Sequence, residues 1–285
     1  MRESILKNTV KSCLVIFCIL IAVHAFEAIV FRMDETIFSE NFINKLFGIT
    51  VLWLVLRVLH WKWSDIGFTS SGITRGIVLG FALAAAAFLV SYAVEVLILK
   101  SQGENVSFGF FTMGFSLTGD AEIHRGIGFI LMCFFFNVIN VIMEEGMFRG
   151  LFYEIIRKDN SAKIAMLIQA LLFGIWHIVT PLHNLIDGDL NPVGFIGMSI
   201  GYIILAGIMG IKWTLLYRMT GSLYTGMADH FFNNCIATNL LHVTTENVTD
   251  DLMIVRVLIA QLLSFAIVTI YWMKRKKDTC KPAQT

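Results

Sequence analysis

Residues 126–157 read GIGFILMCFFFNVINVIMEEGMFRGLFYEIIR, an apolar run that carries Glu144, Glu145 and Arg149 near its centre. About 20 apolar residues are enough to cross the hydrocarbon core of a bilayer, so this run predicts a transmembrane helix. An ionised side chain at the centre of such a helix costs ~2.5–3.5 kcal/mol on insertion scales. Three of them within six residues therefore indicate buried partners, a water-filled cavity or a chemical task.

The composition of the whole chain extends this prediction to a polytopic membrane protein. Of its 285 residues, 56% are hydrophobic and 15% are charged, and its mean hydropathy is +0.73. These values leave too little polar surface for a soluble domain of that size. We predict one all-α integral-membrane domain over residues 1–285 with about eight transmembrane helices, at 12–31, 42–60, 73–99, 126–157, 161–180, 193–217, 221–242 and 252–273.

The basic residues predict the orientation of these helices. With an even number of spans both termini lie on one side, and 16 of the 22 Lys and Arg residues fall in segments on that side. The positive-inside rule then makes both termini cytoplasmic. The net charge is only +1, and its basic residues are spread along one membrane face, so no nucleic-acid partner is indicated. We predict a multi-pass protein of a bacterial plasma membrane, surrounded by the lipid bilayer.

The charged residues of the fourth predicted span divide into two groups. Glu145 and Arg149 are four residues apart, so they share a helix face and can form an ion pair. Adjacent residues on a helix diverge by about 100°, so Glu144 faces elsewhere and is left without that counter-ion. The pattern therefore predicts one neutralised glutamate and one that is free for chemistry.

Two further spans carry polar residues at helical spacing. In the fifth span His177 follows Phe173 by four residues, and in the seventh His230 precedes Asn234 by four. Counted along the helices at ~1.5 Å per residue, Glu144, His177 and His230 fall in the same slab of membrane. One carboxylate and two imidazoles can position and deprotonate a water molecule. They can equally provide three ligands to a zinc ion with one open position.

Structural explanations stay open for each of these residues. The pair Glu145–Arg149 can act purely in packing, and Asn234 can join two helices through a hydrogen bond. Glycines repeated along the sixth span predict close helix packing there. No proline lies in the middle of a predicted span, so no broken helix is expected. Snorkelling accounts for four polar residues at predicted outer helix ends, namely His24, Glu27, Glu95 and His242.

Taken in order, these motifs resemble those of a known family. E-E-x-x-x-R at 144–149, F-x-x-x-H at 173–177 and H-x-x-x-N at 230–234 are similar to the motifs of the CAAX-protease and bacteriocin-processing (CPBP, or Abi) family of intramembrane endopeptidases. The eight-helix layout is also similar to that family's fold, with the motif core at 126–242. The resemblance implies hydrolysis of a peptide bond in a membrane-associated peptide or protein.

The resemblance also implies a role for each motif residue. Glu144 and His177 would activate a water molecule, and His230 and Asn234 would stabilise the oxyanion that follows. The remaining three would support the site, with Glu145 and Arg149 shaping it and Phe173 packing beside it. Family members have been described as glutamate proteases and as metalloproteases. The cofactor is therefore left open, with Zn²⁺ as the candidate and Glu144, His177 and His230 as its ligands.

The sequence also favours one kind of substrate, and it leaves two alternative functions open. The sequence shows no eukaryotic targeting feature, so a short peptide such as a bacteriocin or signalling-peptide precursor is predicted as substrate rather than a prenylated protein. A non-catalytic member of the same fold would serve bacteriocin immunity or act as a scaffold. An ion-coupled transporter would also use intramembrane Glu, His and Arg. Transporters usually show internal repeats and interrupted helices, however, and the sequence indicates neither.

Overall fold

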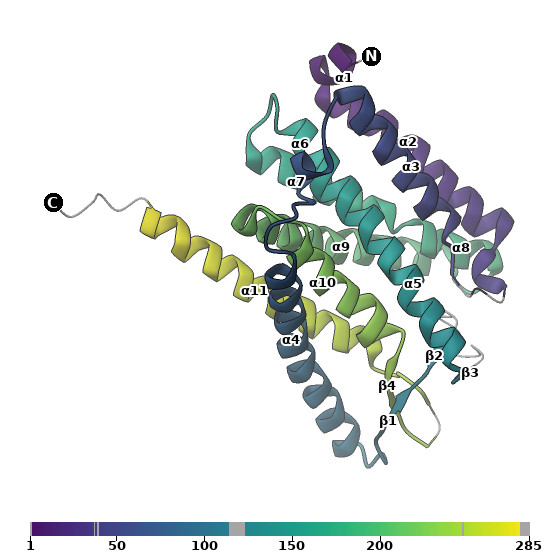
Figure 1. The fold of residues 1–285 in the computed structure, drawn as a ribbon. Coiled ribbons are helices and arrows are strands. Elements are labelled where there is room, and N and C mark those ends of the chain that lie inside the picture. Colours follow the sequence, from purple (N-terminus) through teal and green to yellow (C-terminus); the bar gives the residue numbers. More distant parts are fainter. Residues whose placement is uncertain (1, 37, 39, 114–122, 247, 280–285) are drawn as a thin grey trace.

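The computed structural model describes residues 2–36, 38, 40–113, 123–246 and 248–279, and most of them are helical (Figure 1). The longer helices are α2 (Thr9–Phe26), α3 (Ile43–Leu59), α4 (Ile73–Ser101), α5 (Ile127–Glu144), α7 (Ala162–Trp176), α9 (Pro192–Thr220) and α11 (Met253–Thr279). The shorter ones are α1 (Arg2–Lys7), α6 (Tyr153–Ile156), α8 (Val179–Asp187) and α10 (Tyr224–Phe231).

Other backbone geometries join or extend these helices. In the described part of the chain, three segments are π-helical, η1 (Glu27–Phe31), η4 (Glu145–Phe152) and η5 (Phe232–Thr238), and two are 3₁₀-helical, η2 (Met33–Glu35) and η3 (Trp63–Ile66). Strand β1 (Ser107–Phe110) pairs antiparallel with β4 (Leu241–Thr244). Strand β2 (Thr112–Met113) pairs antiparallel with β3 (Ile123–His124).

Within the described residues, six helical segments are long and apolar enough to cross a membrane, so the chain is a multi-pass membrane protein. They are Thr9–Glu35, Ile73–Ser101, Ile127–Ile156, Ala162–Asp187, Pro192–Thr220 and Met253–Arg275. The predicted spans 42–60 and 221–242 correspond to α3, which has 17 residues, and to α10 continued by η5. The count of eight spans and the cytoplasmic placement of both termini stay predictions, and the basic tail ends at Lys281, outside the described residues.

Helix α5 and its continuation through η4 into α6 occupy the centre of the molecule (Figure 1). Helix α3 packs against α5, and α7 and α9 pack against η4. Helix α4 packs along α10 and α11, and α7 packs along α9. The polar residues of η4 are thereby surrounded by protein, which shields them from lipid.

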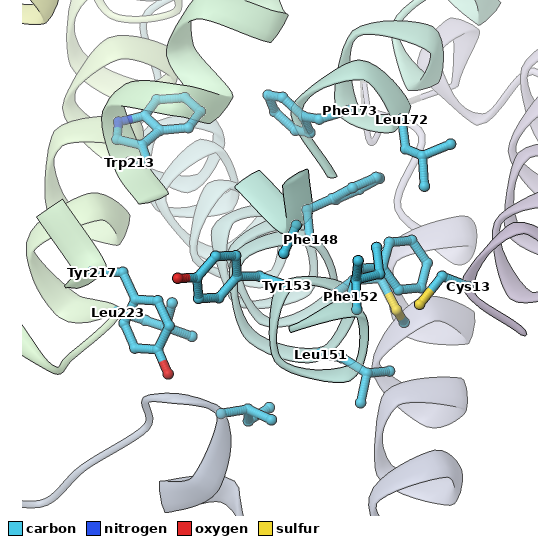
Figure 2. Packing of buried hydrophobic residues seen from close by; sticks show 14 of the residues in the cluster. Cys13, Phe148, Leu151, Phe152, Tyr153, Leu172, Phe173, Trp213, Tyr217 and Leu223 are labelled. Atoms are coloured by element: carbon cyan, nitrogen blue, oxygen red, sulfur yellow. The ribbon is translucent and has the colours of Figure 1, made fainter. Parts of the chain in front are cut away.

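Aromatic side chains fill the core around η4. Figure 2 shows Phe148 close to Phe173 of α7, with Trp213 of α9 on the other side of Phe173. The ring centroids of Phe148 and Phe173 are 5.1 Å apart, and those of Phe173 and Trp213 are 5.9 Å apart, both with edge-to-face geometry. Such pairs lock side-chain orientation as well as burying apolar area, so Phe173 has a fixed position beside the charged residues.

The fifth predicted span is broken, which corrects the expectation of unbroken helices. Helix α7 ends at Trp176 and α8 begins at Val179. The cause is Pro181, whose ring conflicts with the carbonyl four residues earlier, that of His177, and which has no N–H to donate to it. The amide of His177 instead bonds to the carbonyl of Gly174 at 3.2 Å, a tightened final turn. The predicted span stopped at residue 180, just before the proline that breaks it.

Only part of the glycine pattern on α9 serves helix packing. A Cβ atom on Gly210 would lie 3.2 Å from Ala170 of α7, so this glycine does allow a close approach. A Cβ on Gly197 or Gly201 would meet no described atom within 4 Å. On α7, Gly174 is the tighter position, because its Cβ would lie 2.6 Å from the backbone oxygen of Ile203.

Several charged residues that the sequence places at membrane surfaces are in fact buried in pairs. Lys212, counted on the cytoplasmic side, is fully buried and bonds to Asp229. Arg256, counted on the opposite side, pairs with Glu95 at 2.8 Å. Snorkelling therefore does not describe Glu95, nor does it describe Glu27 or His242, which are buried and hydrogen-bonded. Hydrogen-bond partners on other parts of the fold account for these buried groups.

Candidate active site

Glu144 has a buried cationic partner that the sequence did not indicate. The Nζ of Lys45 on α3 lies 2.9 Å from Glu144 Oε1. The indole Nε1 of Trp176 donates to the same oxygen at 3.0 Å. The other oxygen, Oε2, is buried without a hydrogen bond to any described residue and lies 3.5 Å from His230 Nε2. Glu144 therefore has a counter-ion other than Arg149, and this cation comes from a helix 99 residues upstream.

Glu145 joins His230 to Arg149. Its Oε1 accepts a hydrogen bond from His230 Nδ1 at 2.9 Å, and its Oε2 lies 3.5 Å from Arg149 Nε. The predicted pairing of Glu145 with Arg149 is thus present in the structure. The guanidinium carbon of Arg149 also lies 3.7 Å from the ring centroid of Phe173 and 4.7 Å from that of Trp213. Two aromatic faces and one carboxylate together balance this fully buried cation.

The broken helix decides the proton position on His177. Because the amide of His177 bonds to Gly174, the carbonyl of Phe173 is released from the helical pattern. That carbonyl lies 2.8 Å from His177 Nδ1. A carbonyl oxygen can only accept, so Nδ1 carries the proton and Nε2 of this half-buried side chain keeps its lone pair. His177 is therefore arranged as a proton acceptor.

His230 is fixed from both nitrogens and from its face. Its Nδ1 donates to the carboxylate of Glu145, so Nε2 is the acceptor in the neutral ring. The amide Nδ2 of Asn234 lies 3.1 Å from that Nε2, as expected for residues four apart on a helix. Trp213 stacks on the imidazole with a centroid distance of 4.0 Å. The ring plane and the direction of its lone pair are thus both set by neighbours.

A chain of buried hydrogen bonds continues from Asn234 to α11 and α9. Asn233 Nδ2 donates to Asn234 Oδ1 at 2.7 Å, and Gln261 Nε2 donates to Asn233 Oδ1 at 2.9 Å. Lys212 Nζ donates to Gln261 Oε1 at 2.7 Å and to Asp229 Oδ2 at 2.5 Å. Asp229 Oδ2 in turn accepts from the indole of the tryptophan that stacks on His230, at 2.7 Å. The network orients the amide of Asn234 directly and the imidazole of His230 through the indole of Trp213 that stacks on it.

Two π-helical segments bring these residues together. Glu145 begins η4 directly after Glu144 ends α5, and Asn234 lies in η5. A π-helical turn holds more residues than an α-helical turn and rotates the side chains that follow, and such segments are common at functional sites. In this chain they direct Glu145 and Asn234 towards the same imidazole.

The proposed zinc ligands do not fit a metal ion in this arrangement. Within the described part of the chain, Glu144, His177 and His230 do not bring three ligand atoms within 4.8 Å of one another. Glu144 Oε1 already accepts hydrogen bonds from the ammonium of Lys45 and from the indole of Trp176. A metal ion bound at this oxygen would lie against both donors, and the ammonium would repel it. We therefore assign no step of the chemistry to a metal.

The described residues do include one tight group of potential ligands elsewhere. It consists of Glu35 at the end of η2 together with His183 and Asp187 of α8. Arg32 already forms ion pairs with Glu35 and Asp187, so the carboxylate charge there is balanced by protein. This cluster ties η1 and η2 to α8.

Sequence reasoning missed the residues that surround the motifs. Lys45, Trp176, Gln261 and Lys212 belong to none of them. A cation inside an apolar span is costly without a partner, and this signal was available for Lys45 and Lys212. It could not identify the partners, because Glu144 and Asp229 meet these lysines only through packing of distant helices.

The site is thus a cluster of buried carboxylates and imidazoles inside a multi-pass helical membrane protein. Residues 126–236 match the family model described as Rce1-like, type II CAAX prenyl endopeptidase Rce1-like. This segment is thus similar to the family that the motifs resemble, and every predicted site residue lies within the match. A search of curated proteins and a search of solved structures each returned no match.

Proposed function

We propose that this protein is an intramembrane endopeptidase that hydrolyses a peptide bond in a membrane-associated peptide or protein. One observation carries the proposal. Glu144 Oε2, a buried carboxylate oxygen without a hydrogen-bond partner among the described residues, faces an imidazole that is itself held by a second carboxylate. A water molecule bound there would satisfy this acceptor, whose burial without a partner costs ~1–3 kcal/mol.

In the proposed reaction Glu144 and His177 activate water. A water molecule donates one O–H to Glu144 Oε2 and is oriented by His177, whose Nε2 lone pair can accept the other. As the water oxygen attacks the peptide carbonyl carbon, its proton passes to this base pair and a C–O bond forms. General-base assistance of this kind contributes about 10²–10⁴-fold to a hydrolytic rate.

His230 and Asn234 would stabilise the oxyanion that forms. Asn234 Nδ2 carries two N–H groups, of which one is directed to His230 and the other remains for the developing negative charge. Neutral His230, with Glu145 at 2.9 Å and Glu144 at 3.5 Å, would hold this amide through its Nε2 lone pair and so direct the second N–H of Asn234 at the oxyanion. When the C–N bond breaks, the proton held by the base pair passes to the leaving amine.

The position of the site supports a substrate that lies at the membrane. A buried polar site within membrane-spanning helices can reach a peptide bond close to a lipid anchor or a helix end. The family description names a prenyl endopeptidase, whereas the sequence favours a short peptide precursor. Both substrates present a peptide bond at the membrane, and they differ in whether a prenyl group is needed.

Two measurements test the proposal. Purified protein in proteoliposomes is given a fluorogenic peptide with a farnesylated C-terminal CAAX sequence and, separately, the same peptide without farnesyl. In parallel, cells with matched membrane levels of wild type and Glu144→Gln are compared by mass spectrometry of cell-associated and secreted peptides. We expect Glu144→Gln to lower cleavage by about 10²–10⁴-fold and one or more precursors to accumulate.

The matched control is Glu154→Gln, which alters a buried glutamate of the same helical continuation that bonds to Tyr217 and Arg157 instead. This variant should cleave like wild type. If wild type and Glu144→Gln give identical peptide profiles and neither probe is cleaved, the protease function is refuted, and retention of any immunity phenotype would then support the scaffold function.

The helix break at His177 is an observation that favours a second candidate, an ion-coupled transporter. Transporters bind their ions at such interruptions. Proton flux in the same proteoliposomes distinguishes the two functions. Flux that is abolished in Glu144→Gln, without cleavage by wild type, would favour transport.

A further inference from the structure

We propose that Lys45 is a positioning residue of this site, which binds Glu144 Oε1 and thereby reserves Oε2 for the water molecule. The inference rests on the proposed peptidase function and assigns to it a residue outside the matched segment and outside all three motifs. It concerns how the carboxylate of Glu144 is held, since the motifs do not indicate which of its two oxygens accepts the proton of the water molecule.

The two oxygens of Glu144 have different surroundings. Oε1 accepts from the ammonium of Lys45 at 2.9 Å and from the indole of Trp176 at 3.0 Å. Oε2 accepts from no described residue and faces His230. An oxygen that already accepts two hydrogen bonds is a poor base, so the proton of a bound water would pass to Oε2. Without Lys45 only the indole of Trp176 would hold Oε1, so the two oxygens could exchange places more readily by rotation of the carboxylate.

The local structure delivers Lys45 to this position. Lys45 is the third residue of α3, and the start of that helix is capped by Glu27 of η1. Glu27 accepts from the backbone N–H of Ile43 at 2.8 Å and from that of Asn44 at 2.5 Å. A carboxylate is favourable at a helix N-terminus, where the backbone N–H groups have no partner within the helix. Glu27 therefore fixes the turn from which Lys45 extends.

The remaining contacts of Lys45 and α3 keep it directed at Glu144. Its Nζ also lies 5.1 Å from the ring centroid of Trp176, which adds a cation–π attraction. Helix α3 approaches α5 closely at Gly48, where a Cβ would lie 2.6 Å from the side chain of Met143. The lysine is thus held between a rigid helix pair, and little side-chain freedom is left for it to move away.

The test compares Lys45→Met with Lys45→Arg in the cleavage assay, using the farnesylated peptide or whichever precursor the peptide comparison identifies. Methionine keeps the length and removes the charge and donors, so we expect kcat to fall about 10²-fold with KM changed less than about threefold. Arginine restores a cation with donors, so Lys45→Arg should recover at least a tenth of the wild-type kcat. Arg57→Met, which removes an exposed cation from the other end of α3, should be unaffected.

Loss of Lys45 leaves a buried carboxylate unpaired, so Lys45→Met can fail to fold. Trp176→Phe provides a second variant that removes the other donor to Oε1 and leaves the charges balanced. We expect its kcat to fall about tenfold, again with little change in KM. A kcat within threefold of wild type for Trp176→Phe, or for folded Lys45→Met, overturns the positioning role.

A measurement without substrate separates this inference from the proposed function. The melting temperature in detergent is determined for wild type, Lys45→Met, Glu144→Gln and the double variant. We expect Glu144→Gln to raise the melting temperature in the Lys45→Met background and to lower it in wild type. Additive shifts would overturn the Lys45–Glu144 contact even if cleavage is observed. Coupled shifts with no cleavage by wild type would instead refute the proposed function.

Discussion

The buried ion pair between Lys212 and Asp229 gives a prediction whose magnitude can be worked out from the structure. Replacing Lys212 by methionine keeps the shape of the side chain and removes three hydrogen bonds, to Asp229 at 2.5 Å, Gln261 at 2.7 Å and Ser264 at 3.1 Å. It also leaves the carboxylate of Asp229 buried, with the indole of Trp213 as its remaining donor. The change therefore removes one partner of a buried ion pair.

The expected loss of stability can be bounded from both sides. Hydrogen bonds to charged groups are worth ~1.5–3 kcal/mol each, so three at the lower value amount to about 4.5 kcal/mol. Breaking a buried pair on one side costs a similar ~3–5 kcal/mol. Interhelical hydrogen bonds in a membrane average nearer ~0.6 kcal/mol, because the unfolded chain finds other partners there, and three would then give about 2 kcal/mol. We expect a loss between about 2 and 5 kcal/mol.

The assay is unfolding in mixed micelles of dodecyl maltoside and sodium dodecyl sulfate, followed by tryptophan fluorescence. Lys274→Met removes an exposed lysine of α11 and serves as the control. The double variant Lys212→Met/Asp229→Asn removes both charges, so it should be more stable than Lys212→Met alone. A free energy of unfolding within 1 kcal/mol of wild type for Lys212→Met, or losses that simply add in the double variant, would refute the reasoning.

Two further predictions concern packing and pH. Gly174→Ala places a methyl group 2.6 Å from a backbone oxygen of α9, so it should cost about 1–3 kcal/mol and lower cleavage by shifting His177, whereas Gly201→Ala, with open space around its Cβ, should match wild type. Asp250→Asn should destabilise the protein at neutral pH. Burial acts to raise the pKa of Asp250, but hydrogen bonds from His242 and Arg256 outweigh it and hold that pKa below its ordinary value. The stabilisation is therefore present above about pH 4 and is lost as the pH falls through the lowered pKa, so the unfolding free energies of wild type and Asp250→Asn should converge only in acid. A difference that is unchanged down to pH 2 would contradict this assignment.

Much of the site was predictable because it depends on spacing along single helices. The pairs Glu145–Arg149 and His230–Asn234 are four residues apart, and both are in contact in the structure. Long apolar segments likewise predicted a multi-pass membrane protein, and six of the predicted spans correspond to helices that can cross a membrane. These features are local, so they can be read from the order of residues.

The departures from prediction involve distant residues or backbone breaks. Glu144 was expected to be free, but it pairs with Lys45, and the two are 99 residues apart in the sequence. His177 was expected within an unbroken helix, but Pro181 ends α7 next to it. Spacing along a regular helix cannot reveal either feature. The first depends on how α3 packs against α5, and the second on how the chain resolves a missing backbone donor.

The sequence by itself determined the class of this protein, because hydropathy and i,i+4 spacing act within one helix. It also determined which polar side chains need an explanation, since buried charge is costly wherever it occurs in a membrane. Only the tertiary structure decided the partners of those charges, the proton position on His177 and the oxygen of Glu144 that remains available. The partners and the available oxygen depend on hydrogen bonds between helices, which form over about 3 Å, a distance that no pattern along the chain specifies. The proton position depends on the break after α7, which leaves the carbonyl of Phe173 to the imidazole of His177.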